Sequence, residues 1–253
     1  MLTEFLIGLF LPFLGTTLGA LLVFFMRTGL KKKTEEALLG FSGGVMVAAS
    51  VFSLLLPAIE RASYLEFFAF LPAVSGILLG FLFLRLLDLP FAHRQRDDSP
   101  SKKLRMLVLS VTLHNIPEGM AVGVLLSARL AGDTAVSAAA VITLALGIAI
   151  QNFPEGAIIS MPMHGCGAGR GRAFLFALLS ALAELGGALL ALLMSSLVGA
   201  LLPLFLSFAA GAMLFVVVDE LIPNSSHEDK AHTGAVFFAL GFSLMTALDV
   251  ALG

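Results

Sequence analysis

The sequence predicts an all-α membrane protein with eight transmembrane helices, and three observations lead to this prediction. Of 253 residues, 58% are hydrophobic and only 13% are charged, whereas a soluble domain carries about 25% charged residues. Apolar runs long enough to cross a bilayer recur along the whole chain. Charge clusters and turn residues separate these runs. The net charge of −2 and the single cysteine give no indication of a nucleic-acid partner or a disulfide framework.

Each predicted helix has about 20 residues, the length that crosses a ~30 Å hydrocarbon core. In the first helix Glu4 precedes the apolar run and the basic residues follow it. Since a cleavable signal peptide has the reverse order, we expect a transmembrane helix there. The loops are short, so neighbouring helices should be antiparallel within one domain, residues 1–253. We place the helices near residues 4–26, 38–59, 68–88, 105–128, 137–161, 173–197, 201–222 and 233–251.

The distribution of Lys and Arg indicates the orientation of the helices. Twelve of the 15 lie in or beside the loops on one side of the predicted bundle, whereas only Arg61 and Arg129 lie on the other side. Arg85 lies inside a predicted helix and is close enough in sequence to pair with Asp88. Cytoplasmic loops carry the excess of Lys and Arg. We therefore expect both termini on the extracytoplasmic side.

Two pairs of similar segments indicate internal repetition. "HNIPEG" begins at His114 and "QNFPEG" at Gln151, so both contain N-x-P-E-G. The second predicted helix contains "FSGGVM" and then "LLLP"; the seventh contains "FAAGAM" and then "ELIP", and the two should run in opposite directions. Inverted repeats are typical of secondary transporters. Chance similarity between apolar segments explains the second pair equally well.

The two N-x-P-E-G segments place polar side chains on shared helix faces, because residues three or four apart are neighbours on a helix. The polar residues are His114, Asn115 and Glu118 in the fourth helix and Gln151, Asn152 and Glu155 in the fifth. Prolines inside both segments leave carbonyl groups without helical partners, which a bilayer tolerates only where protein or water covers them. Gly119 and Gly156 should allow another backbone to approach.

Glu184 in the sixth predicted helix adds a third carboxylate at the same depth, roughly 14–18 Å from the cytoplasmic side. A charge at the bilayer centre costs at least ~2.5 kcal/mol, and no Lys or Arg is predicted nearby. The carboxylates are therefore protonated, or a cation neutralises them. Imidazole, carboxylate and amide groups suit a borderline divalent ion such as zinc, iron or manganese better than copper(I). The alternative is that these groups hydrogen-bond between helices without binding an ion.

With these motifs, the chain resembles the ZIP (Zrt-, Irt-like protein) family of divalent-metal transporters. The resemblance implies import of metal ions, with Zn²⁺ first and Fe²⁺, Mn²⁺ or Cd²⁺ also possible, across a bacterial cytoplasmic (inner) membrane. It also implies a homodimer and a shift of helices 1, 4, 5 and 6 against helices 2, 3, 7 and 8. It assigns the first ion to His114, Glu118, Gln151, Glu155 and Met46, and the second to Asn115, Glu118, Asn152, Glu155 and Glu184. Met46 is otherwise a core packing residue.

The chain departs from the family at two points. Some bacterial relatives have an aspartate where this chain has Asn152. The neutral amide removes one negative charge, so we expect the second ion position to be weak or absent. The loop at 89–104 has only His93 rather than a histidine-rich tract, which argues against metal buffering by that loop.

Further polar residues are candidates for the transport pathway. They are Asp219, Glu220 and His227 towards the cytoplasm, and Ser53 and Glu60 in and beyond the second helix. The alternative for each set is an ordinary surface or solvated-loop role. His164 and Cys166, in a glycine-rich cytoplasmic loop, are candidates only for passing contact with metal.

Two other functions fit the composition less well. A channel-like pore would pass the same ions downhill, and saturable, proton-dependent uptake would argue against it. An intramembrane metalloenzyme would need H-E-x-x-H spacing or a comparable catalytic pattern, and a serine hydrolase would need G-x-S-x-G. H-E-x-x-H does not occur in the sequence. G-x-S-x-G occurs as "GFSGG" at residues 40–44, inside a predicted transmembrane helix rather than at the strand-to-helix turn that a hydrolase serine needs. We therefore expect a transporter and no enzyme.

Overall fold

The computed structural model describes residues 2–25, 30–92, 100–134, 136–194, 197, 201–225 and 232–252, and within these ranges it is helical without any strand. Two π-helical segments, η1 and η3, continue helices α2 and α9, and η2 is a 3-10 helix. The elements are α1 (Leu2–Phe25), α2 (Lys32–Ala48), η1 (Ala49–Leu55), α3 (Leu56–Arg61), η2 (Ser63–Phe68), α4 (Phe70–Ala92), α5 (Pro100–Leu130), α6 (Ala138–Gly165), α7 (Arg170–Leu193), α9 (Leu202–Val216), η3 (Val217–Leu221), α10 (Ile222–Ser225) and α11 (Thr233–Leu252).

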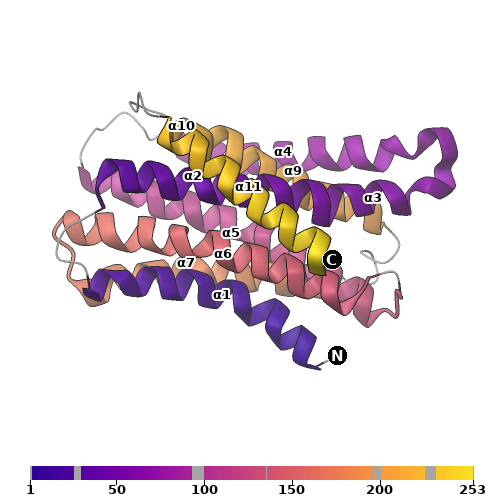
Figure 1. Ribbon diagram of the computed structural model, residues 1–253, viewed down its shortest axis with the longest axis horizontal. Helices are drawn as coiled ribbons and strands as arrows, with labels where there is room; N and C mark the ends of the chain where they lie inside the picture. Colours follow the sequence, from indigo (N-terminus) through magenta and orange to yellow (C-terminus); the bar gives the residue numbers. More distant parts are fainter. Residues whose placement is uncertain are drawn as a thin grey trace.

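Seven helices in the described part of the chain are long and apolar enough to cross a membrane. They are Leu2–Phe25, Lys32–Arg61, Phe70–Leu87, Ala138–Gly165, Arg170–Leu193, Leu202–Ser225 and Thr233–Leu252. Helix α5, with 31 residues, is not among the seven, and it carries the polar "HNIPEG" segment. The count of eight spans and the outer location of the termini therefore stay predictions. Figure 1 places both ends of the chain towards the same end of the bundle, as an even number of crossings requires.

Several helices extend beyond the predicted spans. Helix α2 begins at Lys32 rather than near residue 38, α5 begins at Pro100 rather than near 105, and α6 continues to Gly165 rather than to 161. Hydropathy indicates where the lipid ends, whereas the backbone hydrogen bonds of a helix continue into water. Helix α7 ends earlier than expected, at Leu193.

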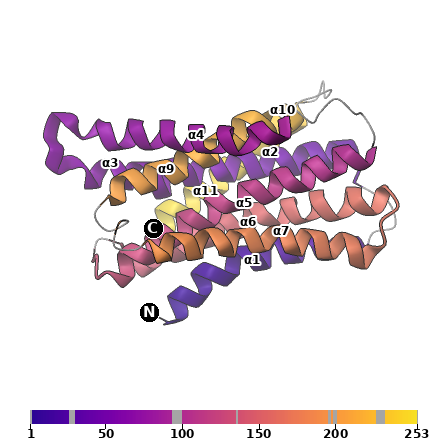
Figure 2. The same ribbon diagram turned by 180° about the vertical axis from the view of Figure 1, so that it is seen from behind.

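The helices form two groups that lie side by side in Figures 1 and 2. In the first, α1 packs against α6 and α7, and α5 packs against α7. We call α1, α5, α6 and α7 the motif-bearing group. In the second, α2 packs against α11, and α4 packs against α9; with η1, α3, η3 and α10 these helices are the flanking group. The two groups meet mainly where α2 contacts α6 and where α9 contacts α5.

The pattern of helix contacts repeats itself within the chain. If α1 is exchanged with α7, α2 with α9, α4 with α11 and α5 with α6, the pair α1–α6 becomes α7–α5, and α2–α11 becomes α9–α4. The π-helical segments η1 and η3 also correspond, since each leads directly into a short helix with a proline at its second position, Pro57 or Pro223. These correspondences support the repeat inferred from the second and seventh predicted helices.

The two glycines that follow the motif glutamates lie against neighbouring backbones, as the sequence predicted. A Cβ atom added at Gly119 in α5 would lie 1.8 Å from the carbonyl oxygen of Glu184 in α7. One added at Gly156 in α6 would lie 2.0 Å from the carbonyl oxygen of Thr16 in α1. Only glycine fits at these distances. The close contacts set α5 against α7 and α6 against α1, with the motif side chains between them.

Candidate metal centre

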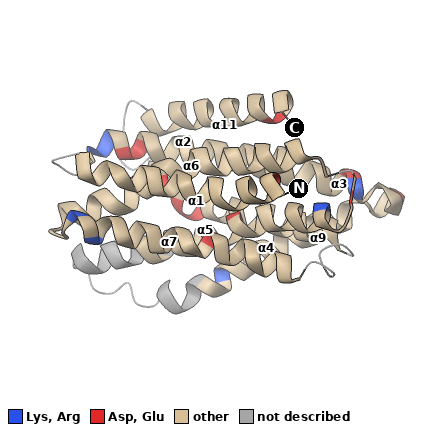
Figure 3. Ribbon diagram, turned by 90° about the horizontal axis from the view of Figure 1, so that it is seen from below, with Lys and Arg blue, Asp and Glu red and all other residues tan. Residues whose placement is uncertain are grey.

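The three predicted carboxylates are buried in the interior of the motif-bearing group. Glu118 is fully buried, and Glu155 and Glu184 are 4% and 2% exposed. In Figure 3, acidic residues lie on the interior helices well away from both ends of the bundle. Charged groups this deep need partners or a counter-ion. The question is which side chains supply them.

Glu118 is joined to the second copy of the motif through Gln151. The side-chain nitrogen Nε2 of Gln151 donates a hydrogen bond of 2.7 Å to Oε1 of Glu118. Glu155, one turn after Gln151 on α6, accepts instead from α2, where the Ser42 hydroxyl lies 3.1 Å from its Oε1. The two motif glutamates therefore have neutral partners of different kinds, an amide and a hydroxyl.

Asn152 takes the role of partner for Glu184. Its Nδ2 atom lies 3.1 Å from both Oε1 and Oε2 of Glu184 and 3.4 Å from the carbonyl oxygen of Pro12 in α1. An aspartate at position 152 could not donate these hydrogen bonds. Asn152 of α6 thus contacts both α7 and α1 next to the Glu184 carboxylate.

Asn115, the counterpart of Asn152 on α5, is held without any carboxylate. Its Nδ2 atom donates to the carbonyl oxygen of Ser180 at 2.9 Å and lies 3.3 Å from the Ser180 hydroxyl. Thr112 extends this network, with its hydroxyl 3.0 Å from that of Ser180. A backbone carbonyl can only accept a hydrogen bond. The nitrogen of Asn115 must therefore face Ser180, and its oxygen must face the other way.

Five of the motif side chains each keep one buried oxygen without a hydrogen-bond partner. These atoms are Oδ1 of Asn115, Oε2 of Glu118, Oε1 of Gln151, Oδ1 of Asn152 and Oε2 of Glu155. Buried polar atoms are nearly always paired in proteins, so such a set needs an explanation. All five are amide or carboxylate oxygens, which accept but do not donate when the carboxylates are ionised. They are donor atoms suited to a divalent cation.

Carboxylates and imidazole alone do not form a compact cage. Within the described ranges, no three or more His, Cys, Asp and Glu side chains are placed so that they could hold a metal ion. Any ion bound here therefore needs amide oxygens among its ligands. Asn115, Gln151 and Asn152 have buried amide oxygens available for this, and their role as ligands stays a prediction.

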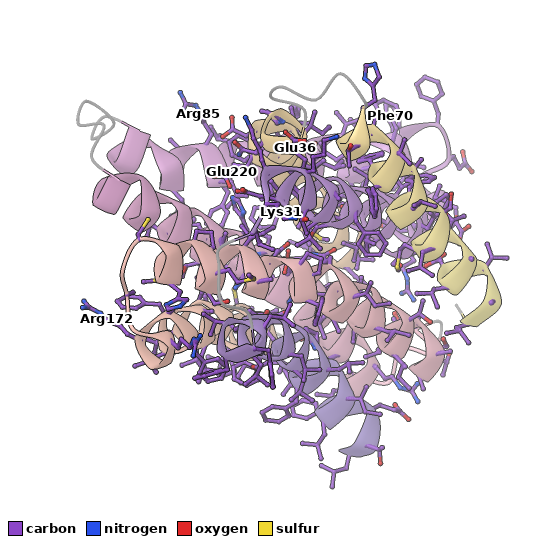
Figure 4. The ribbon with its side chains drawn as sticks, turned by 60° about the vertical axis from the view of Figure 1, so that its left-hand side comes forward. Lys31, Glu36, Phe70, Arg85, Arg172 and Glu220 are labelled. Atoms are coloured by element: carbon purple, nitrogen blue, oxygen red, sulfur yellow. The ribbon has the colours of Figure 1, made fainter. Side chains whose placement is uncertain are left out.

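His114 points towards the flanking group. Its Nε2 atom lies 3.4 Å from Oε2 of Glu220 in η3, and the histidine is 7% exposed whereas the Glu220 side chain is 26% exposed. Segment η3 packs against α2. Lys31, directly before α2, and Glu36 in its first turns are labelled with Glu220 in Figure 4. Glu220 thus connects the motif to a more accessible region. Asp219 is exposed, and His227 lies outside the described residues.

The remaining predicted residues lie on or near α2. Met46 is fully buried in the apolar core, four residues after Ser42, and its role as a ligand stays a prediction. The Ser53 hydroxyl donates to Oδ1 of Asp249 in α11 at 2.6 Å. Glu60 is exposed. The predicted pathway residue Ser53 therefore has an acidic partner.

Sequence reasoning missed three of these polar residues. Asp249 is the only charged residue of α11, and a lone carboxylate in an apolar helix was a usable signal. Ser42 and Ser180 each lie four residues before a predicted site residue, Met46 and Glu184 respectively. Helical spacing alone could have placed both on the faces that carry the site.

Comparison with known proteins gives a consistent result. A model of the family described as "ZIP Zinc transporter" matches residues 92–249. The chain is 37% identical to zinc transporter ZIPB of Bordetella bronchiseptica over 95% of its own length and 79% of that protein. It is 36% identical to zinc transporter GufA of Myxococcus xanthus, covering 94% of this chain and 95% of the relative. Human zinc transporter ZIP11 is 30% identical over 99% and 97% of the two chains.

Proposed function

The chain belongs to the ZIP family of zinc transporters, and from that premise we propose that it imports divalent metal ions, zinc first, through a centre on α5, α6 and α7. It is an integral membrane protein and a transporter, not an enzyme. Iron, manganese and cadmium ions are further substrates that such donors can hold. Metal is therefore the cargo of this protein and no resident cofactor.

The observation that carries the proposal is the set of five buried oxygens without partners. They come from both copies of N-x-P-E-G, and a cation is the partner that would satisfy several of them together. Hydrogen bonding between helices, the alternative considered from the sequence, accounts for the nitrogen atoms of Gln151 and Asn152. It leaves the oxygens unexplained.

We assign two ion positions of unequal strength. The first consists of His114, Glu118, Gln151 and Glu155, with Met46 as a further ligand. The second consists of Asn115, Glu118, Asn152, Glu155 and Glu184. At the second position Asn152 already donates to both oxygens of Glu184, so a cation must compete with that amide. We therefore propose one firmly bound ion at the first position and weaker binding at the second.

The proposed pathway runs from the end of the bundle that carries the termini to the opposite end. Ser53, its partner Asp249 and exposed Glu60 lie on the outer side, and His114 leads from the centre to Glu220 and then to Asp219 and His227. The contact of 3.4 Å between His114 and Glu220 supports this exit, because histidine can transfer an ion from the centre to an acidic acceptor. The termini are then extracytoplasmic, and transport proceeds into the cytoplasm.

Movement of one helix group against the other is the proposed means of alternating access. The motif-bearing group corresponds to predicted helices 1, 4, 5 and 6, and the flanking group to helices 2, 3, 7 and 8. The packing supports this division, since each group is held by extensive contacts among its own helices. We further propose a homodimer in a bacterial cytoplasmic membrane.

Uptake into proteoliposomes by a Glu118→Gln variant tests the proposal. Because Glu118 belongs to both proposed ion positions, the variant should lose zinc uptake by about 100-fold or more while it remains inserted and folded. Glu66→Gln makes the same atomic change at an exposed carboxylate and should transport normally. Zinc uptake at the wild-type rate in folded Glu118→Gln would refute the assignment. A wild-type rate that does not saturate with zinc would favour a channel-like pore.

A further inference from the structure

Ser42, in α2 of the flanking group, donates a hydrogen bond to Glu155, a carboxylate of the candidate metal centre. It is fully buried in α2. Its hydroxyl lies 3.1 Å from Oε1 of Glu155 and 3.2 Å from the carbonyl oxygen of Gln151. A serine has one hydroxyl proton, so these two acceptors of α6 share it.

Ser50 shows that this use of a hydroxyl is not a general property of the helix. It is also fully buried, eight residues further along the same continuous helix. Its hydroxyl donates to the carbonyl oxygen of Met46 at 2.7 Å, which is the local backbone contact that serine commonly makes in a helix. Ser42 instead reaches across to the motif, more than 100 residues away in sequence.

The contact makes the two oxygens of Glu155 unequal. Oε1 accepts from Ser42, whereas Oε2 is buried without a partner. The hydrogen bond from Ser42 occupies one lone pair of Oε1 and fixes the orientation of the carboxylate, which leaves Oε2 as the more available oxygen for an ion. Zinc is usually four-coordinate with short metal–oxygen distances, whereas manganese favours six oxygen ligands and gains when a carboxylate offers both of its oxygens.

We propose that Ser42 is a positioning residue that holds Glu155 for coordination through Oε2 alone and thereby favours zinc over manganese. This inference rests on the proposed function, because Glu155 must be a ligand of the transported ion. Without the hydroxyl, Glu155 is free to turn and to bind through both oxygens. The preference for zinc should then fall while transport itself continues.

Competitive uptake of Zn²⁺ and Mn²⁺ into proteoliposomes tests this role in the full-length protein. In Ser42→Ala the ratio of Vmax/KM for zinc to that for manganese should fall about tenfold, the effect of losing one hydrogen bond to a charged group. Ser42→Thr keeps the hydroxyl and should restore the ratio. Ser50→Ala removes an equally buried hydroxyl and should leave the ratio unchanged.

The outcomes separate this inference from the proposed function. If Glu118→Gln is inactive but Ser42→Ala keeps the wild-type ratio, the role of Ser42 is wrong and the centre stands. If folded Glu118→Gln transports zinc normally, the centre itself is wrong. If the ratio of Vmax/KM for zinc to that for manganese falls equally in Ser50→Ala, the effect of Ser42 comes from packing in α2 and the inference is wrong. If Ser42→Ala does not insert, Ser42→Cys keeps the shape with a weaker donor, and an unchanged ratio there would overturn the inference.

Discussion

The two copies of N-x-P-E-G have the same backbone packing but different hydrogen-bond partners. Both copies set a glycine against a neighbouring backbone, at Gly119 and at Gly156. The asparagines differ, because Asn115 donates to the backbone and hydroxyl of Ser180 whereas Asn152 donates to the carboxylate of Glu184. The repeat has therefore kept the packing of the helices and changed the electrostatics of the site.

This difference shows how the chain accommodates a third buried carboxylate. The orientation of Asn115 does not depend on any charged group, so its oxygen faces away from Ser180 whether or not an ion is bound. The orientation of Asn152 depends on Glu184, and its amide provides the hydrogen bonds that an ionised Glu184 needs. One copy holds its amide in an orientation fixed by the backbone of Ser180, and the other holds its amide against a carboxylate.

The largest effect should come from the feature that the copies share. Gly119→Ala and Gly156→Ala would place a Cβ atom within 2.0 Å of a backbone oxygen, and backbone on a packed helix cannot move aside easily. Each should lower the free energy of unfolding by about 3 kcal/mol or more. Thermal unfolding in detergent and the yield of inserted protein measure this. Gly186→Ala, where nothing lies within 4 Å, is the control, and tolerance of Ala at 119 or 156 would contradict the packing.

Asn152→Asp should change the number of bound ions. It replaces the donors to Glu184 with a second carboxylate, and an unpaired buried charge costs about 3 kcal/mol. In chelator the variant should therefore unfold at a lower temperature than wild type, and zinc should restore its stability. Zinc titration of the purified protein should show a second firmly bound ion. If Asn152→Asp binds the same number of zinc ions per protein as wild type, Asn152 is not the cause of weak binding at the second position.

Asn115→Asp is the matched substitution in the other copy and should behave differently. The new carboxylate would face the carbonyl oxygen of Ser180, which Asn115 Nδ2 contacts at 2.9 Å. Loss of this buried hydrogen bond should cost about 1–3 kcal/mol, and zinc should not restore it because the lost partner is a backbone carbonyl rather than a carboxylate. Thermal unfolding with and without zinc compares the variants. Full recovery with zinc would mean that the two asparagines have the same role.

The sequence predicted which polar side chains are buried together better than it predicted their hydrogen-bond partners. Residue type and spacing identified His114, Glu118, Glu155 and the close glycine contacts, since these depend on a single helix and on the cost of burying charge. The partners Ser42, Ser180 and Asp249 lie on other helices, and their contacts follow from how those helices are rotated against the motif. Hydropathy cannot determine that rotation. Hydropathy also could not reveal the π-helical segments η1 and η3. A π-helix differs from an α-helix in its backbone hydrogen bonds, from i to i+5 instead of i to i+4, and needs no distinctive residue type.

The smallest effects should come from two ion pairs at the end of the bundle where the chain termini lie. Arg129 pairs with Glu4 at 2.5 Å and joins α5 to α1 within the motif-bearing group. Arg61 pairs with Asp133 and joins α3 of the flanking group to the α5–α6 connection. Partly exposed pairs contribute at most about 1 kcal/mol. Only the second pair must break if the groups move against each other.

Arg61→Gln should therefore raise the Vmax of zinc uptake, by no more than about fivefold for a contact of this strength, with little change in thermal stability. Arg129→Gln should lower thermal stability only slightly and leave Vmax unchanged, because its pair moves as part of one group. Uptake kinetics and thermal unfolding of both variants measure the contrast. Equal effects on Vmax would mean that the boundary between the two groups is not where movement occurs.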